Sequence, residues 1–179
     1  MNNIKLREHK SSSYAPRTYH NAAQGVTLAV AVNHYTAGER LTQKAAGDKI
    51  VKVDWGTEYI QASRELYKAL KKHNCHTVNV AGNGIYTFSK SGVKQEDVNQ
   101  YIWNVLSKVN EHWPITKIVS GGQTGADLAS LVAGVSLGIE TEAMYPSGYK
   151  IRFEDGKDVL MNPQEIYRQI MDYVSALNK

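Results

Sequence analysis

The chain has 179 residues, of which 42% are apolar and 21% are charged, a composition typical of one globular domain. Its single cysteine, Cys75, excludes an internal disulfide and a thiolate metal cluster. No run approaches the ~20 consecutive apolar residues of a membrane span. The N-terminal sequence lacks the apolar core of a secretory signal. We therefore expect a cytoplasmic protein with no membrane partner.

The isoelectric point near 9.0 raises the question of nucleic-acid binding. Residues 1–25 carry four basic side chains against one acidic one, whereas the rest of the chain holds 17 basic and 16 acidic side chains. The excess charge therefore belongs to the N-terminal segment and not to a face of the domain. We predict that residues 1–25 form a basic, solvated leader that is free to be mobile, and that nucleic acid is not the partner.

From residue 26 onward, short apolar or β-branched runs alternate with helical patterns. The predicted strands are residues 26–32, 49–55, 77–81, 116–120 and 140–145. The predicted helices begin near Thr57, near Glu96, near Thr124 and at Asn162. The second helix has an apolar stripe at positions 98, 102, 105 and 109, which fits either core packing or contact with a second copy. Self-association is therefore left open.

Strands that alternate with helices of this length predict βαβ units and a mostly parallel sheet. We predict an α/β fold: residues 26–179 form a single doubly wound Rossmann-like domain, with about five strands and helices on both faces. In such sheets, ligands bind outside the carboxyl ends of the strands, where the strand order reverses. The loops that follow the predicted strands are therefore the places to search for a site.

The most distinctive of these loops follows the strand at residues 116–120 and leads directly into a helix. Its glycines let the backbone approach a ligand closely, and the helix start supplies free N–H groups for an anion. The loop is neither a P-loop nor a GxGxxG turn. A tight turn whose glycines serve packing alone is the alternative. The ligand-binding residues predicted here are Gly121, Gly122, Gln123, Thr124, Gly125 and Asp127.

Three other strand ends supply further candidates. Gly82, Asn83 and Gly84 follow the strand at residues 77–81, and Asn33 follows the first predicted strand. Lys150 and Arg152 lie beyond the last strand and could neutralise a phosphate. The alternatives are a left-handed turn residue for Asn83 and ordinary solvated charges for the two basic residues.

The run from Lys117 to Lys150 resembles the family described as molybdenum carriers, within the SLOG superfamily of Rossmann-like proteins. The resemblance is carried by GGQTGAD at residues 121–127, Leu-Gly-Ile at 137–139 and Pro-Ser-Gly at 146–148. It implies binding of a nucleotide-related ligand, with the phosphate at the glycine loop. It also implies a place among phage or bacterial proteins, some of which act in defence.

The superfamily includes the LOG enzymes, which cleave the N-glycosidic bond of nucleotides with a Glu on the helix after a PGGxGT motif. This chain has Leu128-Ala129-Ser130 where that Glu would fall. Asp127 is the motif-borne catalytic candidate if the protein is an enzyme, and Glu39 or Asp54 could approach from other strand ends.

Two functions therefore stand side by side. One is a protein that binds a nucleotide-derived molecule, such as an NAD-like, ADP-ribose-like or cyclic nucleotide, for sensing or sequestration. The other is an N-glycosidic-bond hydrolase or transferase that acts on nucleotides. We expect no metal site and no resident cofactor in either case, because no ligand spacing in the sequence supports one.

Overall fold

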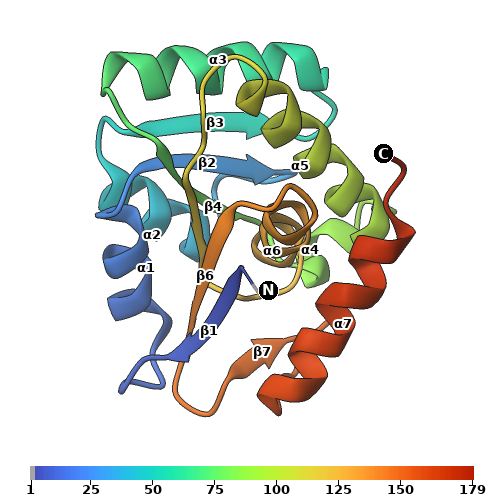
Figure 1. The fold of residues 1–179 in the computed structure, drawn as a ribbon. Helices are drawn as coiled ribbons and strands as arrows, with labels where there is room; N and C mark the ends of the chain where they lie inside the picture. The colour runs from blue at the N-terminus through green and yellow to red at the C-terminus, as the bar shows by residue number, and fades with distance from the viewer. Residues whose placement is uncertain (1–2) are drawn as a thin grey trace.

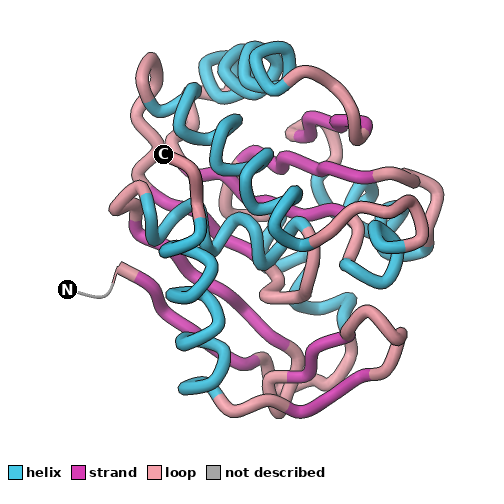
Figure 2. Tube along the Cα trace, turned by 90° about the vertical axis from the view of Figure 1, so that its right-hand side faces the viewer, coloured by secondary structure: helices cyan, strands magenta, loops and turns pink. Residues whose placement is uncertain are grey.

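The computed structural model describes residues 3–179. Six strands form one sheet in the order β1-β6-β5-β4-β2-β3, and every neighbouring pair in it is parallel (Figure 1). These strands are β1 Ile4–Glu8, β2 Val26–Ala31, β3 Ile50–Asp54, β4 Thr77–Gly82, β5 Lys117–Ser120 and β6 Glu140–Tyr145. A separate antiparallel pair, β7 Lys150–Arg152 and β8 Asp158–Leu160, forms a hairpin at one end of the molecule (Figure 2).

Seven helices lie within the described residues and flank the sheet on both faces. They are α1 Tyr14–Ala22, α2 Ala37–Ala46, α3 Tyr59–Lys72, α4 Ile85–Ser89, α5 Gln95–Asn110, α6 Ala126–Ser136 and α7 Pro163–Ala176. The predicted doubly wound α/β fold and its five predicted strands are confirmed. The chain passes from β2 to β3 on one side and then to β4 on the other, so the strand order reverses between β2 and β4.

Most helix boundaries follow the sequence signals. The Asn162 side chain accepts a hydrogen bond from the Gln164 N–H, with Pro163 in the first turn. The predicted cap of α3 is one residue off, since its N-cap is Glu58 rather than Thr57, whereas α6 begins with Gly125 as its N-cap, near Thr124 as predicted. Neither of these N-caps uses its side chain. Helices α2 and α4 and the β7–β8 hairpin were not predicted.

The two faces of the sheet differ in side-chain size. Val26, Leu28 and Val30 point toward α3, α5 and α6 and belong to the main apolar core. The apolar stripe of α5, at positions 98, 102, 105 and 109, is fully buried there, so it serves the core and offers no face to a second copy. Because side chains alternate along a strand, Thr27 and Ala29 point to the opposite face, toward α1 and α2. These small side chains leave room beside that face.

The structure corrects the predicted leader. Residues 4–22 form β1 and α1, and β1 pairs in register with β6, Ile4 opposite Thr141. Leu6 packs against the second apolar cluster, and Arg17, Asn21 and Ala22 of α1 are buried. The alternating charges conceal a half-exposed edge strand, in which Ile4 and Leu6 are partly buried and Lys5, Arg7 and Glu8 are exposed. Residues 1 and 2 of the predicted leader lie outside the described part of the chain.

Within residues 3–179, no helix combines the length and the apolar character that a bilayer span requires.

A point substitution tests whether β1 packs into the fold or is a solvated leader. We expect Leu6→Ala to lower the free energy of unfolding by about 1–2 kcal/mol, because it removes partly buried methyl groups from the second apolar cluster. Lys5→Ala is the control, since Lys5 is exposed and makes a surface ion pair with Glu140. Urea unfolding measures both variants. Equal stability of the two would contradict the packing of β1.

Candidate functional site

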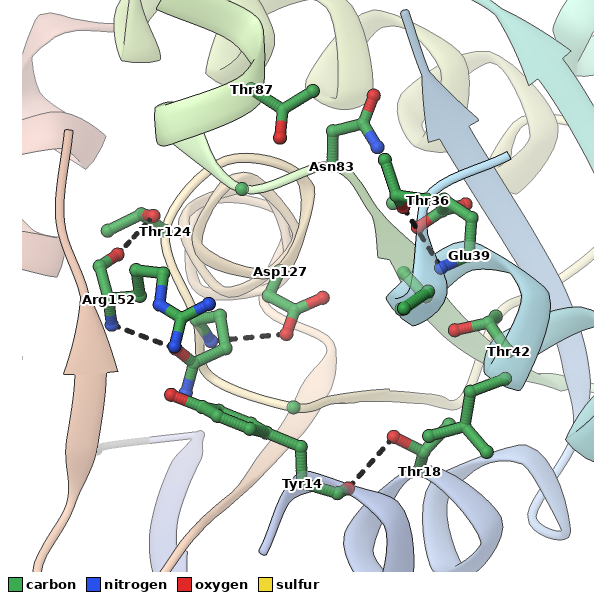
Figure 3. A pocket seen from close by; sticks show the side chains of 18 of the residues that line it. Tyr14, Thr18, Thr36, Glu39, Thr42, Asn83, Thr87, Thr124, Asp127 and Arg152 are labelled. Atoms are coloured by element: carbon green, nitrogen blue, oxygen red, sulfur yellow. Dashed lines mark hydrogen bonds between the residues drawn. The ribbon is translucent and has the colours of Figure 1, made fainter. Parts of the chain in front are cut away.

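A cavity of about 570 Å³ opens at the carboxyl ends of β2 and β4, where the strand order reverses. Its walls come from α1, the start of α2, the end of β4, α4 and the β5–α6 loop (Figure 3). Asn79 and Ala81 of β4 line it from the small-residue face of the sheet. Ligand cavities in open α/β sheets occupy this position.

The cavity brings together eight of the twelve predicted ligand-binding residues. They are Gly82, Asn83, Gly84, Gly121, Gln123, Thr124, Asp127 and Arg152. The other four do not line it: Gly122, Gly125, Asn33 and Lys150. As expected, the β4 and β5 loops face one crevice because the two strands are neighbours. Whether these residues bind a ligand stays a prediction.

The N–H groups of the glycine loop already have partners inside the protein. Gly122 N–H donates to the Ser120 hydroxyl at 3.2 Å, and Gln123 N–H donates to the Asp127 carboxylate at 3.1 Å. Gly125 N–H donates to Gln95 Oε1 at 2.7 Å. An anion at these three groups would have to displace protein acceptors, and the Gly121 end of the loop is covered by the Arg17 and Asp127 side chains.

The polar side chains of the same loop tie it to β7. Gln123 donates to the Lys150 carbonyl at 2.8 Å and accepts from the Arg152 N–H at 3.0 Å. The Thr124 hydroxyl donates to the Arg152 carbonyl and accepts from the Ile85 N–H (Figure 3). Both side chains therefore hold the hairpin and α4 in place.

Gly122 has φ +72° and lies against the ring of the buried Tyr145. A Cβ atom at this position would overlap that ring, so the glycine is required for packing. Gly122 variants are thus poor tests of ligand binding, because they disturb the fold itself.

Asn83 joins the strand ends around the cavity. Its side-chain oxygen accepts from the N–H groups of Val32 and Asn33, and its side-chain nitrogen donates to the Asn33 carbonyl. Its own carbonyl accepts from the Ala126 N–H at 3.1 Å. The residue has no positive φ, so the proposed left-handed turn is wrong. Asn83 is a structural bridge at the cavity wall.

The mouth of the cavity carries a cluster around Tyr14 of α1. Arg152 pairs with Asp158 at 2.8 Å, and the Tyr14 hydroxyl donates to the same carboxylate at 3.2 Å. The Lys150 ammonium lies 4.6 Å from the centre of the Tyr14 ring and donates to the Ser12 carbonyl. The β7–β8 hairpin thus packs against α1 beside the cavity. Arg152 is partly neutralised by Asp158, and Lys150 is hydrogen-bonded to the Ser12 carbonyl.

Sequence reasoning missed Arg17, which it placed in the leader. The side chain is only 8% exposed and lies directly over Gly121, leaving no space for a Cβ there. Its Nη1 is 3.8 Å from Asp127 Oδ2, and its Nε has no hydrogen-bond partner among the described residues. A buried guanidinium nitrogen without a hydrogen-bond partner is costly, and because Arg17 also lines the cavity, its side chain is a candidate contact for an acidic ligand group.

Two carboxyl groups lie on opposite sides of the cavity: Asp127 on α6 and Glu39 on α2 (Figure 3). Burial raises the pKa of Glu39 to about 7, and the charge of Asp127 adds to this rise. Burial also raises the pKa of Asp127, while Arg17 and the Gln123 N–H act against the rise. Glu39 Oε2 has no hydrogen-bond partner in residues 3–179. Glu39 was the weaker sequence candidate, since only its strand-end position had suggested it.

The described residues contain no cluster of three or more His, Cys, Asp or Glu side chains that could hold a metal ion. No protein-family model, curated protein or solved structure matches this chain. The resemblance to SLOG proteins therefore stays a hypothesis that rests on the motif.

The pKa of Glu39 predicts how stability changes with pH. The folded state binds the proton more tightly than the unfolded chain, whose glutamate has a pKa of 4.5. The stability contributed by the protonated group is therefore lost as the pH rises from about 4.5 to about 7. We expect Glu39→Gln to gain stability over the wild type across this range, by on the order of 3 kcal/mol.

Chemical denaturation at pH 4.5 and pH 8 measures this gain. Glu65→Gln, at an exposed position paired with Lys68, is the control and should show little pH-dependent difference from the wild type. A Glu39→Gln variant that parallels the wild type at both pH values would contradict the raised pKa.

Proposed function

We propose that the protein binds a nucleotide-derived small molecule in this cavity, with a phosphate group beside Arg17 and Gly121. The observation that carries the proposal is the buried Arg17 guanidinium, whose Nε has no hydrogen-bond partner in the described chain. A phosphate offers the planar pairs of acceptors that a guanidinium binds best. Arg17 thus replaces Lys150 and Arg152 as the main phosphate contact in our proposal.

The size and lining of the cavity support a ligand of this class. A volume of about 570 Å³ falls in the range of small-molecule sites. Tyr14 and Tyr86 line the cavity and offer rings on which a base can stack. The carboxyl groups of Glu39 and Asp127 are acceptors for ribose hydroxyls. Sugar recognition at the carboxylates and phosphate recognition at Arg17 are therefore compatible within one cavity.

The charged side chains of the site affect how strongly it can bind an anionic ligand. Asp127 lies 3.8 Å from Arg17 and repels a phosphate that approaches the same guanidinium. Protonation of Glu39, with a pKa of about 7, removes one of the two negative charges facing the ligand. Binding of an anionic ligand should therefore strengthen as the pH falls through 7.

The resemblance to SLOG proteins supports the same ligand class, and we include in the proposal a cytoplasmic sensing or sequestering role in phage–bacterium conflict. The proposal also allows self-association. The apolar stripe of α5 cannot be its interface, because that stripe is buried in the core.

One observation favours the enzymatic alternative. Glu39, with its pKa of about 7, faces the same cavity as Asp127. In an N-glycosidic hydrolase, a protonated Glu39 would donate its proton to the departing base nitrogen. The Asp127 carboxylate would stabilise the positive charge that develops on the sugar, and water would add to the anomeric carbon. In this mechanism Glu39 is the proton donor, and Asp127, the catalytic candidate from the motif, serves as the stabilising carboxylate.

A thermal-shift screen tests the binding proposal. The purified protein is mixed with AMP, NAD, ADP-ribose and cyclic nucleotides, and each mixture is then separated by chromatography. A ligand at 100 times its Kd stabilises the folded state by ~2.7 kcal/mol, a shift of several degrees. Recovery of the intact compound supports a binding protein, whereas free base plus sugar phosphate supports the hydrolase.

We expect Arg17→Gln to weaken binding of the active compound by about 10- to 100-fold, because charge-assisted hydrogen bonds are lost. Arg7→Gln is the matched control, since Arg7 lies on β1 and pairs with Glu142 away from the cavity. Calorimetric titration measures both affinities, each on a variant with a cooperative melt. Unchanged affinity of Arg17→Gln would reject the phosphate position.

A further inference from the structure

Behind Glu39, away from the cavity, lies a histidine that the sequence analysis did not use as an acid–base residue. His34 follows β2, and its Nδ1 is 3.7 Å from Glu39 Oε2. On the other side of the ring, Nε2 lies 3.2 Å from the Val53 carbonyl and 3.3 Å from Asp54 Oδ1. The pairing of β2 with β3, Ala31 opposite Asp54, places these groups in line.

The surroundings of the ring determine where its hydrogens lie. The Val53 carbonyl can only accept, so the Nε2 atom facing it carries a hydrogen. The Nδ1 atom is then free to accept a proton or to hold a second one. Both Nδ1 of His34 and Oε2 of Glu39 are buried and have no other hydrogen-bond partner in residues 3–179. Two such atoms that face each other can share a proton after a small closing movement.

Other charged groups around Glu39 come from three elements. Asp127 of α6 faces it across the cavity and disfavours its ionised form. Arg17 of α1 lies closer to Asp127 and compensates that charge in part. Asp54 of β3, an exposed carboxylate, lies on the outer side of the His34 ring, 3.3 Å from Nε2. Acidic side chains therefore lie on both sides of the ring, Glu39 at Nδ1 and Asp54 at Nε2.

We propose that His34 is a positioning residue for Glu39, and that the two side chains share a proton between Nδ1 and Oε2. The proposal deepens the function proposed above, because it makes Glu39 the proton-exchanging group of that cavity. When the pair gives the shared proton to a bound molecule, the Oε2–H bond of Glu39 breaks and its electron pair stays on the carboxylate, beside a neutral imidazole that keeps its Nε2–H. The pair then holds one proton fewer, and solvent in the cavity returns it to the Glu39 carboxylate.

The test is a pH titration of the free protein, followed by the carboxyl carbon resonance of Glu39 in carbon-13 NMR. In the wild type we expect two steps separated by more than one pH unit, because the two groups titrate as a coupled pair. In His34→Asn, whose amide can hydrogen-bond but does not titrate, we expect a single step. His112→Asn is the matched control: His112 lies 3.7 Å from Glu111, but both side chains are exposed. This control should keep both steps.

A single step in the wild type, with the same midpoint as in His34→Asn, would overturn the proposal. Should His34→Asn not fold, His34→Gln takes its place, because its amide also hydrogen-bonds without titrating. The titration uses no ligand, so its result is independent of whether any nucleotide binds. If the screen finds a ligand, the pH dependence of its affinity should be shallower in His34→Asn than in the wild type. An identical dependence would also count against the role of His34.

Discussion

The hydrogen bonds of Asn83 fix the relative positions of the strand ends on which the cavity depends. One side chain satisfies backbone groups of the segment after β2, and the adjacent carbonyl holds the first residue of α6. The close approach is possible because Gly125 packs directly on the Asn83 backbone. Buried backbone groups must be paired, and here one residue pairs those of two crossover connections. The walls of the cavity are therefore rigid where the sheet reverses its order.

The same arrangement explains why buried charged groups that line the cavity keep polar atoms without a hydrogen-bond partner in residues 3–179, namely Arg17 Nε and Glu39 Oε2. Arg17, Asp127 and Glu39 come from three helices that the sheet and its loops hold apart. Neither Arg17 nor Glu39 can move to a better partner without disturbing buried neighbours. Stability is given up at this position, as is common where a protein recognises a ligand or performs chemistry.

The sequence predicted the core strands well because their apolar runs are continuous and buried. It failed for β1 and α1, because β1 is largely exposed and charged and the buried residues of α1 include the polar Arg17 and Asn21. For the site, the glycine loop and the strand ends were found from their residue types. Arg17, Glu39 and His34 have ordinary local sequences, and only the packing of α1 and α2 makes them buried neighbours. Whether a charged side chain is buried depends on tertiary packing, so no local sequence pattern predicts it.

The pairing of β1 with β6 also has a consequence for how the protein is made. Strand β1 is made before β6 but cannot join the sheet until β6 exists, since Ile4 pairs with Thr141. Closing a loop of that length is slow compared with forming a local βαβ unit. The segment from β2 to β5 can assemble during synthesis, whereas α1 takes its place over Gly121 only when β6 has emerged. A chain that ends before β6 can thus form part of the sheet, but the cavity walled by α1 is completed only after β6 is made.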